Sequence, residues 1–251
     1  MGGVVFFKEN CMERIYPAAG GGHQIVTVPC SGVRRGAERT VAVSDGVVYY
    51  LGNDGVYAFD GSMPVCVSRA LGDKRYIGGV GGGESGRYWL AAKEAAGTTE
   101  LLVYDTQRKL WHRQDTVEVM DFVRQDGVML LCRDGRLLDT AGEVGTKETN
   151  VVWSAESGDL GLYTPEHKYL ARLELRMKRE EGAVVKAFVR YDNGETWEQV
   201  GTVTGTAEQT RGAVMQLRPR RCGHLRLKLM GLGRCRVYSA SAVYEKGSDV
   251  E

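Results

Sequence analysis

Residues 76–111 read YIGGVGGGESGRYWLAAKEAAGTTELLVYDTQRKLW, and this stretch decides the fold class. It holds four runs of β-forming residues, and short segments rich in Gly, Ser, Thr and Asp separate them. Such punctuation is typical of strands joined by turns. The strands are expected at Ile77–Val80, Arg87–Ala92, Leu101–Tyr104 and Leu110–Arg113. The stretch therefore predicts a small four-stranded unit.

The same pattern occurs on both sides of this unit. One unit is expected at residues 40–68, a third begins near residue 119, and a partial unit lies in residues 4–28. The fourth strand of the third unit is expected at residues 151–154. Four-stranded units of roughly 30–45 residues in tandem are the signature of β-propeller blades. Residues 1–157 are therefore predicted to form a partial or small β-propeller of about three to four blades. Since propellers usually have about 4–8 blades, we expect either that neighbouring chains complete the ring or that the sequence is a fragment of a longer protein.

The unit at residues 76–115 resembles a kelch blade. A glycine run, Gly81 to Gly83, is followed by Tyr104 and then by Trp111. Glycines would let the inner strand approach the blade axis closely, because they have no side chain. The Tyr and Trp side chains would cover the hairpin.

The C-terminal third has a different pattern. Residues 158–166 read as a linker, and six strands with alternating apolar and polar residues follow between Tyr169 and Tyr244. Alternation of this kind is typical of strands with one buried face. The sequence therefore predicts an all-β chain in which a β-sandwich or jelly roll, residues 167–251, follows the propeller-like repeats.

One hairpin of the predicted sandwich holds a motif. In residues 188–200, FVRYDNGETWEQV, the residues Asp192, Gly194, Thr196 and Trp197 have the spacing of the Asp-box of sialidase propellers. In the structural interpretation, which we favour, Asp accepts backbone N–H bonds in the turn, Gly takes a positive φ, and Trp packs on the hairpin. A sialidase would also need an arginine triad, a tyrosine nucleophile with its glutamate, and an aspartic acid. No such constellation is identifiable, and the motif lies outside the repeats.

Other catalytic and cofactor patterns are not identifiable either. The four histidines stand far apart without a triad signature, and the six cysteines include no C-x-x-C pair of a zinc site. The glycine-rich residues 78–83 lack the Lys and Ser or Thr of a phosphate-binding loop. We therefore expect no enzymatic activity and no cofactor or metal. No stretch has the length and composition of a signal peptide or a membrane span, so no membrane contact is expected.

Charge is unevenly distributed along the chain, although the net charge is only +1. Residues 1–166 hold 17 Lys and Arg against 22 Asp and Glu, whereas residues 167–251 hold 16 against 10. A basic cluster of this kind allows non-specific contact with DNA or another anionic partner, and a solvated strand face is the competing interpretation. The candidate contact residues are Arg218, Arg220, Arg221, Arg226 and Lys228. No ladder of aromatic residues runs through them, so recognition of a base sequence is not expected.

Several longer stretches together carry a family resemblance. They are FFKENCMERIYP with QIVTVPCSGV, VVYYLGNDGVYAFDGSMPVCVSRALGD, LLVYDTQRKLWHRQD, and the ending RPRRCGHLRLKLMGLGRCRVYSASAVYEKGSDV. They look like virion proteins encoded by phages and prophages of Gram-positive gut bacteria. Those proteins have a propeller followed by a β-sandwich, and they are similar to the tail-hub and DNA-stabilising proteins of short-tailed phages.

The resemblance implies a structural protein of the head–tail junction or tail. It would be assembled in the bacterial cytoplasm and reside in the virion, as a homo-oligomer around the DNA channel in contact with portal, adaptor or tail proteins. Two alternatives remain open. One is a glycan-binding or sialidase-like propeller with a receptor-binding role, which predicts a concave pocket at the blade axis lined by Arg, Tyr and carboxylates. The other is a kelch-like protein-interaction module.

Overall fold

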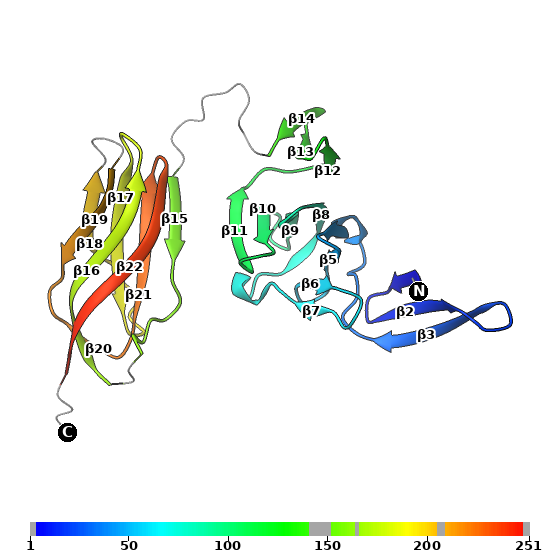
Figure 1. Cartoon of the computed structure of the whole chain (residues 1–251), viewed down its shortest axis with the longest axis horizontal. Coiled ribbons are helices and arrows are strands. Elements are labelled where there is room, and N and C mark those ends of the chain that lie inside the picture. Colours follow the sequence, from blue (N-terminus) through cyan, green and yellow to red (C-terminus); the bar gives the residue numbers. More distant parts are fainter. Residues whose placement is uncertain (1–3, 141–151, 164–165, 205–208, 248–251) are drawn as a thin grey trace. The chain divides into compact units, whose positions relative to one another are not determined.

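The computed structural model describes residues 4–140, 152–163, 166–204 and 209–247, and it is all-β (Figure 1). The chain divides into two compact units, Met1–Thr146 and Lys147–Glu251. Two short 3-10 turns, η1 (Glu38–Thr40) and η2 (Arg69–Leu71), interrupt the strands of the first unit. Within the described ranges, no helix is long and apolar enough to cross a membrane.

The first unit consists of four antiparallel sheets that follow one another along the chain. Their strands are β1 (Val4–Phe7), β2 (Cys11–Pro17), β3 (His23–Pro29), β4 (Ala42–Ser44), β5 (Val47–Leu51), β6 (Val56–Phe59), β7 (Val65–Cys66), β8 (Tyr76–Glu84), β9 (Arg87–Glu94), β10 (Thr99–Asp105), β11 (Leu110–Asp115), β12 (Asp121–Gln125), β13 (Val128–Arg133) and β14 (Arg136–Asp139). The sheet orders are β1-β2-β3, β4-β5-β6-β7, β8-β9-β10-β11 and β12-β13-β14. In each of these sheets, strands that are hydrogen-bonded to each other are also consecutive along the chain.

Tight turns explain this local pairing. Three of the hairpins turn at an Asp-Gly pair in which both residues have positive φ, for example 49° at Asp45 and 81° at Gly46. Asp tolerates this left-handed conformation and Gly adopts it without strain. Two successive positive φ values are typical of the two-residue turns whose twist matches that of the flanking strands.

The four sheets stack face to face, and a separate small core fills each of the three contacts. Tyr49 and Tyr50 illustrate the arrangement, since adjacent residues of a strand point to opposite faces. Tyr50 lies in the core between the first and second sheets, and Tyr49 lies in the core between the second and third. Trp89 and Leu131 lie in the core between the third and fourth sheets. Each buried side chain of this size stabilises its contact by roughly 1.5–3 kcal/mol.

The glycine run of β8 allows the second and third sheets to approach closely. A Cβ at Gly81 would lie 2.3 Å from the carbonyl oxygen of Thr40, and one at Gly83 would lie 1.9 Å from that of Val43. Both acceptors are backbone atoms that no side-chain rotation can move. The β8 backbone therefore packs directly against η1 and β4 because it carries no side chains there.

The second unit consists of two sheets around one core. Its strands are β15 (Val152–Glu156), β16 (Lys168–Arg179), β17 (Val184–Tyr191), β18 (Glu198–Thr204), β19 (Gln209–Gln216), β20 (Arg221–Cys222), β21 (Leu225–Leu232) and β22 (Cys235–Lys246). One sheet has the order β15-β21-β17-β18, and in the other β16 pairs with β19, β20 and β22. Leu175 of β16 and Val189 of β17, both fully buried, belong to the shared core.

The partner of one strand differs from the prediction. A strand near residues 151–154 was expected to complete the third repeat, but β15 pairs with β21 in the second unit, where Glu156 lies opposite Lys228. Residue 151 lies outside the described residues. The predicted strand was therefore assigned to the wrong sheet, because alternation marks a strand without marking its partner.

The segment expected to be a linker, residues 158–166, is attached to the second unit where the structure describes it. Leu160 forms a β-bridge with Leu225. The buried amine of Lys168 donates hydrogen bonds to the carbonyl oxygens of Gly161 and Gly223, at 2.6 and 2.7 Å. Residues 164 and 165 lie outside the described residues. The compact units divide between Thr146 and Lys147, whereas the predicted domains were residues 1–157 and 167–251. These predicted boundaries stay predictions.

The all-β class is confirmed. None of the sheets closes on itself within the described ranges, and the four stacked sheets of the first unit form no closed ring there.

Candidate functional site

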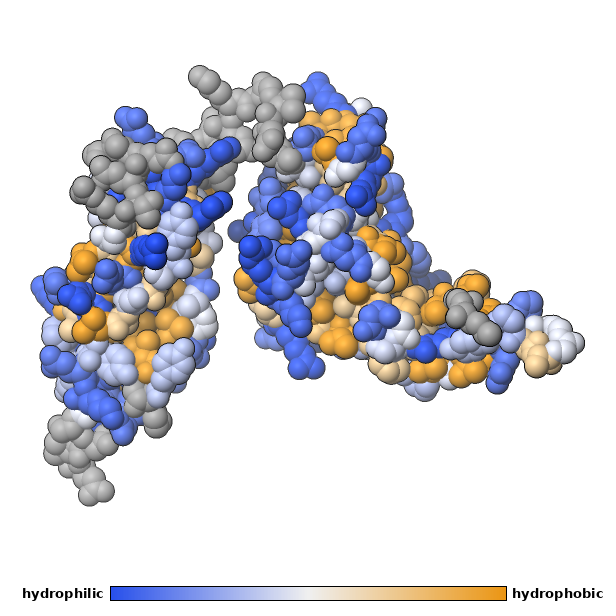
Figure 2. Space-filling view, viewed as in Figure 1, coloured by the Kyte–Doolittle hydropathy of each residue, from blue (hydrophilic) through white to orange (hydrophobic). Residues whose placement is uncertain are grey.

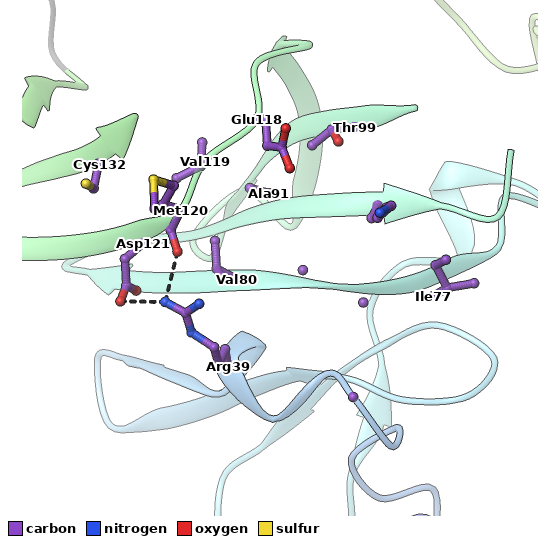
Figure 3. Close-up of a pocket in the computed structure, with 14 residues that line it drawn as sticks. Arg39, Ile77, Val80, Ala91, Thr99, Glu118, Val119, Met120, Asp121 and Cys132 are labelled. Carbon is purple, nitrogen blue, oxygen red and sulfur yellow. Dashed lines mark hydrogen bonds and ion pairs between the residues drawn. The ribbon is translucent and has the colours of Figure 1, made fainter. Parts of the chain in front are cut away.

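A cavity of about 680 Å³ lies beside β8 in the first unit (Figure 3). Residues 77–80 of β8, together with Ala91 and Lys93 of β9, form one side of it. Residues 118–121, which lead into β12, form the opposite wall. Two of the β8 residues are glycines, which leave backbone exposed to the cavity. The register of β8 against β9 also shifts between Tyr76 and Gly78, so the strand is irregular at this point.

Arg39 holds the wall of the cavity in place. Its guanidinium donates hydrogen bonds to the Asp121 carboxylate, at 2.7 Å, and to the Met120 carbonyl oxygen, at 2.8 Å, as Figure 3 shows. More than half of each side chain of the Arg39–Asp121 pair is exposed. Surface pairs of this kind contribute about 0–1 kcal/mol, so the contact orients the wall more than it stabilises the fold.

Part of the cavity lining has the composition of a small-molecule pocket. Apolar side chains with a few polar groups are typical of such pockets, whose volumes run from about 300 to 1,000 Å³. Lys93, Thr99 and Glu118 supply polar groups besides the Arg39–Asp121 pair. The glycan-binding alternative predicted a pocket lined by Arg, Tyr and carboxylates. The lining contains Arg39 and the carboxylates of Glu118 and Asp121, and among the described residues it contains no Tyr. Where the structure describes the chain, no three His, Cys, Asp or Glu side chains gather as metal ligands.

A buried carboxylate, Glu100, lies in the same sheet beside a second cavity of about 460 Å³. Its oxygens accept hydrogen bonds from Lys74 at 2.6 Å, Arg113 at 3.1 Å and Tyr76 at 2.9 Å. Burial alone would raise the pKa of this carboxyl, but the three donors together hold the pKa below its ordinary value. Glu100 is thus an ionised group that joins β8, β10 and β11.

The two end faces of the sheet stack are apolar and exposed. The first end face is the outer side of β1–β3, opposite the side that packs on the second sheet. The last end face is the outer side of β12–β14, opposite the side that packs on the third sheet. The first end face contains Val4, Phe6, Ile15 and Ile25. The last end face contains Val123, Val128, Leu130 and Leu137.

Exposure separates the end faces from the cores beneath them. Phe6 is 53% exposed and Ile25 is 60% exposed, whereas Met12 of the inner side is fully buried. Leu137 is 57% exposed, whereas Met129 is 2% exposed. Figure 2 shows hydrophobic residues at the surface over both β1–β3 and β12–β14. Contiguous exposed apolar surface of this kind marks sites of interaction in soluble proteins.

The Asp-box-like motif joins β17 and β18, which pair as a hairpin. Its positive φ, 50°, belongs to Asp192 and not to Gly194, so that part of the structural interpretation is corrected. The Asp192 carboxylate accepts backbone N–H bonds from Gly223, at 2.7 Å, and His224, at 3.2 Å. These donors belong to the neighbouring turn between β20 and β21, so Asp192 ties two turns of the second unit together.

Trp197 lies under two cations. The Arg190 guanidinium is 4.9 Å from the centre of its ring, and the Lys228 amine is 5.5 Å from it. Cation–π contacts at exposed sites contribute about 0.5–1 kcal/mol each. Thr196, the remaining motif residue, is exposed in the turn.

The five basic candidate residues do not form one free patch. Arg218 and Arg221 are exposed, and Arg220 lies 5.4 Å above the Tyr191 ring. Arg226 forms an ion pair with Asp159, whose carboxyl pKa this partner lowers. A contact of these residues with an anionic partner stays a prediction.

Sequence reasoning did not identify the cavity or the Glu100 cluster. The cavity draws on three segments that are far apart, at Arg39, at residues 77–99 and at residues 118–132, and none carries a motif. Glu100 looks like an ordinary turn-flanking acid in the sequence. The end faces could have been predicted, because β1 (VVFF) and β13 (VMLLCR) are nearly continuous apolar runs that place apolar residues on both sides of the strand.

No protein-family model matches the chain, and no curated protein is significantly similar to it. A comparison with solved structures finds an exo-β-1,3-galactanase from Phanerochaete chrysosporium in complex with galactose. The sequences are 8% identical, the match covers 94% of this chain and 68% of the galactanase, and the TM-score is 0.21.

This neighbour is an enzyme, so the expectation that the chain has no enzymatic activity is corrected and is not carried further. A likeness at this TM-score gives no argument about the activity of the chain.

Proposed function

We propose that the chain is a structural protein of a bacteriophage or prophage particle, placed at the head–tail junction or in the tail. In this proposal the first unit is a partial β-propeller whose blades are the four stacked sheets. The second unit is a β-sandwich that follows the propeller along the chain. The protein works as an oligomer in contact with other virion proteins.

The observation that carries the proposal is the open stack of the first unit. Each inner sheet is covered on both faces, whereas the first and last sheets each leave one apolar face exposed among the described residues. Monomeric soluble proteins rarely expose large contiguous apolar patches, and such patches commonly mark sites of interaction with a neighbour. A protein that works inside a multi-chain assembly has such a neighbour.

The sequence and the strand arrangement add two supports. The glycine run of β8 brings β8 close to β4 and η1 on one side and to Phe122 of β12 on the other, as inner strands of adjacent blades require. The phrases quoted for the virion family cover residues from every sheet of the first unit except the last.

The proposal is tested by locating the protein. Phage particles from an induced culture of the source bacterium are purified by density gradient, and their proteins are identified by mass spectrometry. We expect the chain to be present in the particle fraction at a fixed ratio to portal protein. Its presence only in the particle-free fraction would reject the proposal.

A second candidate function is glycan binding, and the cavity beside β8 is the observation that favours it. Arg39, Lys93 and Glu118 offer charged hydrogen-bonding groups around an exposed backbone. Screening on a glycan array, with Arg39→Ala and Lys93→Ala as variants, tests this function. Binding that both variants lose would support it, and the absence of any bound glycan would remove it.

The third candidate, a kelch-like interaction module, would act inside a cell. The particle-localisation experiment therefore also distinguishes this module from a virion protein.

A further inference from the structure

We propose that the two end faces bind each other between copies of this chain, so that the first end face of one copy covers the last end face of the next. This inference deepens the proposed function and rests on its partial propeller, because it names the partner that completes the stack. The partner is a second copy of the same chain, in a head-to-tail contact.

The first argument is that this contact repeats one the molecule already makes three times. Every contact inside the stack joins the apolar face of one sheet to the apolar face of the next. The first end face presents Phe6 and Ile25, and the last end face presents Val123 and Leu137, on strands of the same small antiparallel type. A fourth contact of this kind would continue the stack from one copy into the next.

The second argument is the charge on the two faces. Glu13, whose side chain shares the first end face with Phe6, forms an ion pair with Lys8. Asp121, at the start of β12, forms an ion pair with Arg39. Because these two carboxylates beside the faces are paired within the chain, an apolar partner fits the faces better than a basic one.

The third argument is that one kind of contact covers both faces. The two faces lie on opposite ends of one stack, so a single chain cannot bring them together without closing a ring. A self-complementary dimer through one face would leave the other exposed. A head-to-tail contact covers both and produces a closed ring if the rotation per copy closes, or a filament if it does not.

The test uses two charge-introducing variants of the full chain. Phe6→Glu places a carboxylate on the first end face, and Leu137→Glu places one on the last. Both side chains are more than half exposed, so the substitutions leave the cores intact. Val65→Glu in β7, at a site that is 62% exposed and belongs to neither end face, is the matched control. Circular dichroism and thermal melting verify that each variant is folded.

We expect the unmodified chain and Val65→Glu to form the same oligomer in light scattering after size-exclusion chromatography. Each end-face variant alone should have the mass of the 27.6 kDa monomer. Mixed in equal amounts, the two variants should form a 1:1 dimer. The mixture retains one intact pair of faces, the last end face of Phe6→Glu and the first end face of Leu137→Glu.

Three results would overturn the inference. They are a monomeric unmodified chain, an oligomer that persists in both variants, and a mixture that stays monomeric. An oligomer that persists in a variant would indicate a self-complementary contact through its intact face, and a monomeric unmodified chain would indicate that no second copy covers the end faces. Detection in phage particles is a separate measurement, so the proposed function can hold when the head-to-tail contact fails.

Discussion

The two units of the chain bury their apolar residues in different ways. The first unit divides them among three small cores between four sheets, and the second gathers them into one core between two sheets. A stack can be extended at either end, because each added sheet needs only one new contact. Two sheets around a single core cover each other's inner faces and need no further layer. The comparison therefore supports the proposal that a neighbouring copy extends the first unit and not the second.

The largest expected effect is the loss of a core side chain from the second unit. Leu175→Ala removes a fully buried side chain from the one shared core, and we expect a loss of about 2–5 kcal/mol in the unfolding free energy of that unit. Hydrogen exchange, followed by mass spectrometry on peptides from each unit, measures the change. Exchange should accelerate throughout the second unit and stay unchanged in the first. Equal acceleration in both would show that the two units unfold together.

The next effect concerns the close approach of β8 to β4. Gly83→Ala places a methyl group 1.9 Å from the backbone oxygen of Val43, so the two sheets must separate. We expect the first unit to lose about 1–3 kcal/mol. Gly78→Ala on the same strand is the control, because its Cβ would lie 3.3 Å from the Gly36 oxygen. Urea denaturation of both variants gives the difference. Equal stability of the two variants would contradict the packing described for β8.

A smaller effect is expected from the buried carboxylate. Because the folded-state pKa of Glu100 lies below its ordinary value of 4.5, its contribution to stability is present above that pH. The contribution is lost as the pH falls through the folded-state pKa. Glu100→Gln should cost about 1–2 kcal/mol at neutral pH and should flatten the loss of first-unit stability in acid. Glu94→Gln is the control, because Glu94 also accepts a hydrogen bond from Lys74 but not from Tyr76 or Arg113. Thermal melts over a pH series would contradict the prediction if both variants kept the acid dependence of the unmodified chain.

The smallest effect is expected at the Asp-box-like hairpin. Trp197→Ala removes two cation–π contacts from the surface of the second unit, and we expect a loss of about 1 kcal/mol. Trp197→Phe keeps an aromatic ring and should recover part of it. Chemical denaturation measures both. A loss as large as that of Leu175→Ala would mean that the hairpin belongs to the core.

Local features were predictable from the sequence, and distant pairings were not. The hairpin at Asp45 and Gly46 follows from two residues that tolerate positive φ, so the adjacent strands could be placed. The strand near residues 151–154 was also visible, but its partner β21 lies more than 70 residues away. Alternation cannot identify a partner at that distance. The positive φ was expected at Gly194 and occurs at Asp192, whose carboxylate binds a second turn that the local motif does not include.

The mass of the unmodified full chain in solution tests the central claim most directly. Light scattering over a concentration series measures it without any substitution. The open stack predicts a discrete multiple of 27.6 kDa, or a population that grows head to tail with concentration. A mass of 27.6 kDa at every concentration would contradict the claim that a second copy covers the two end faces.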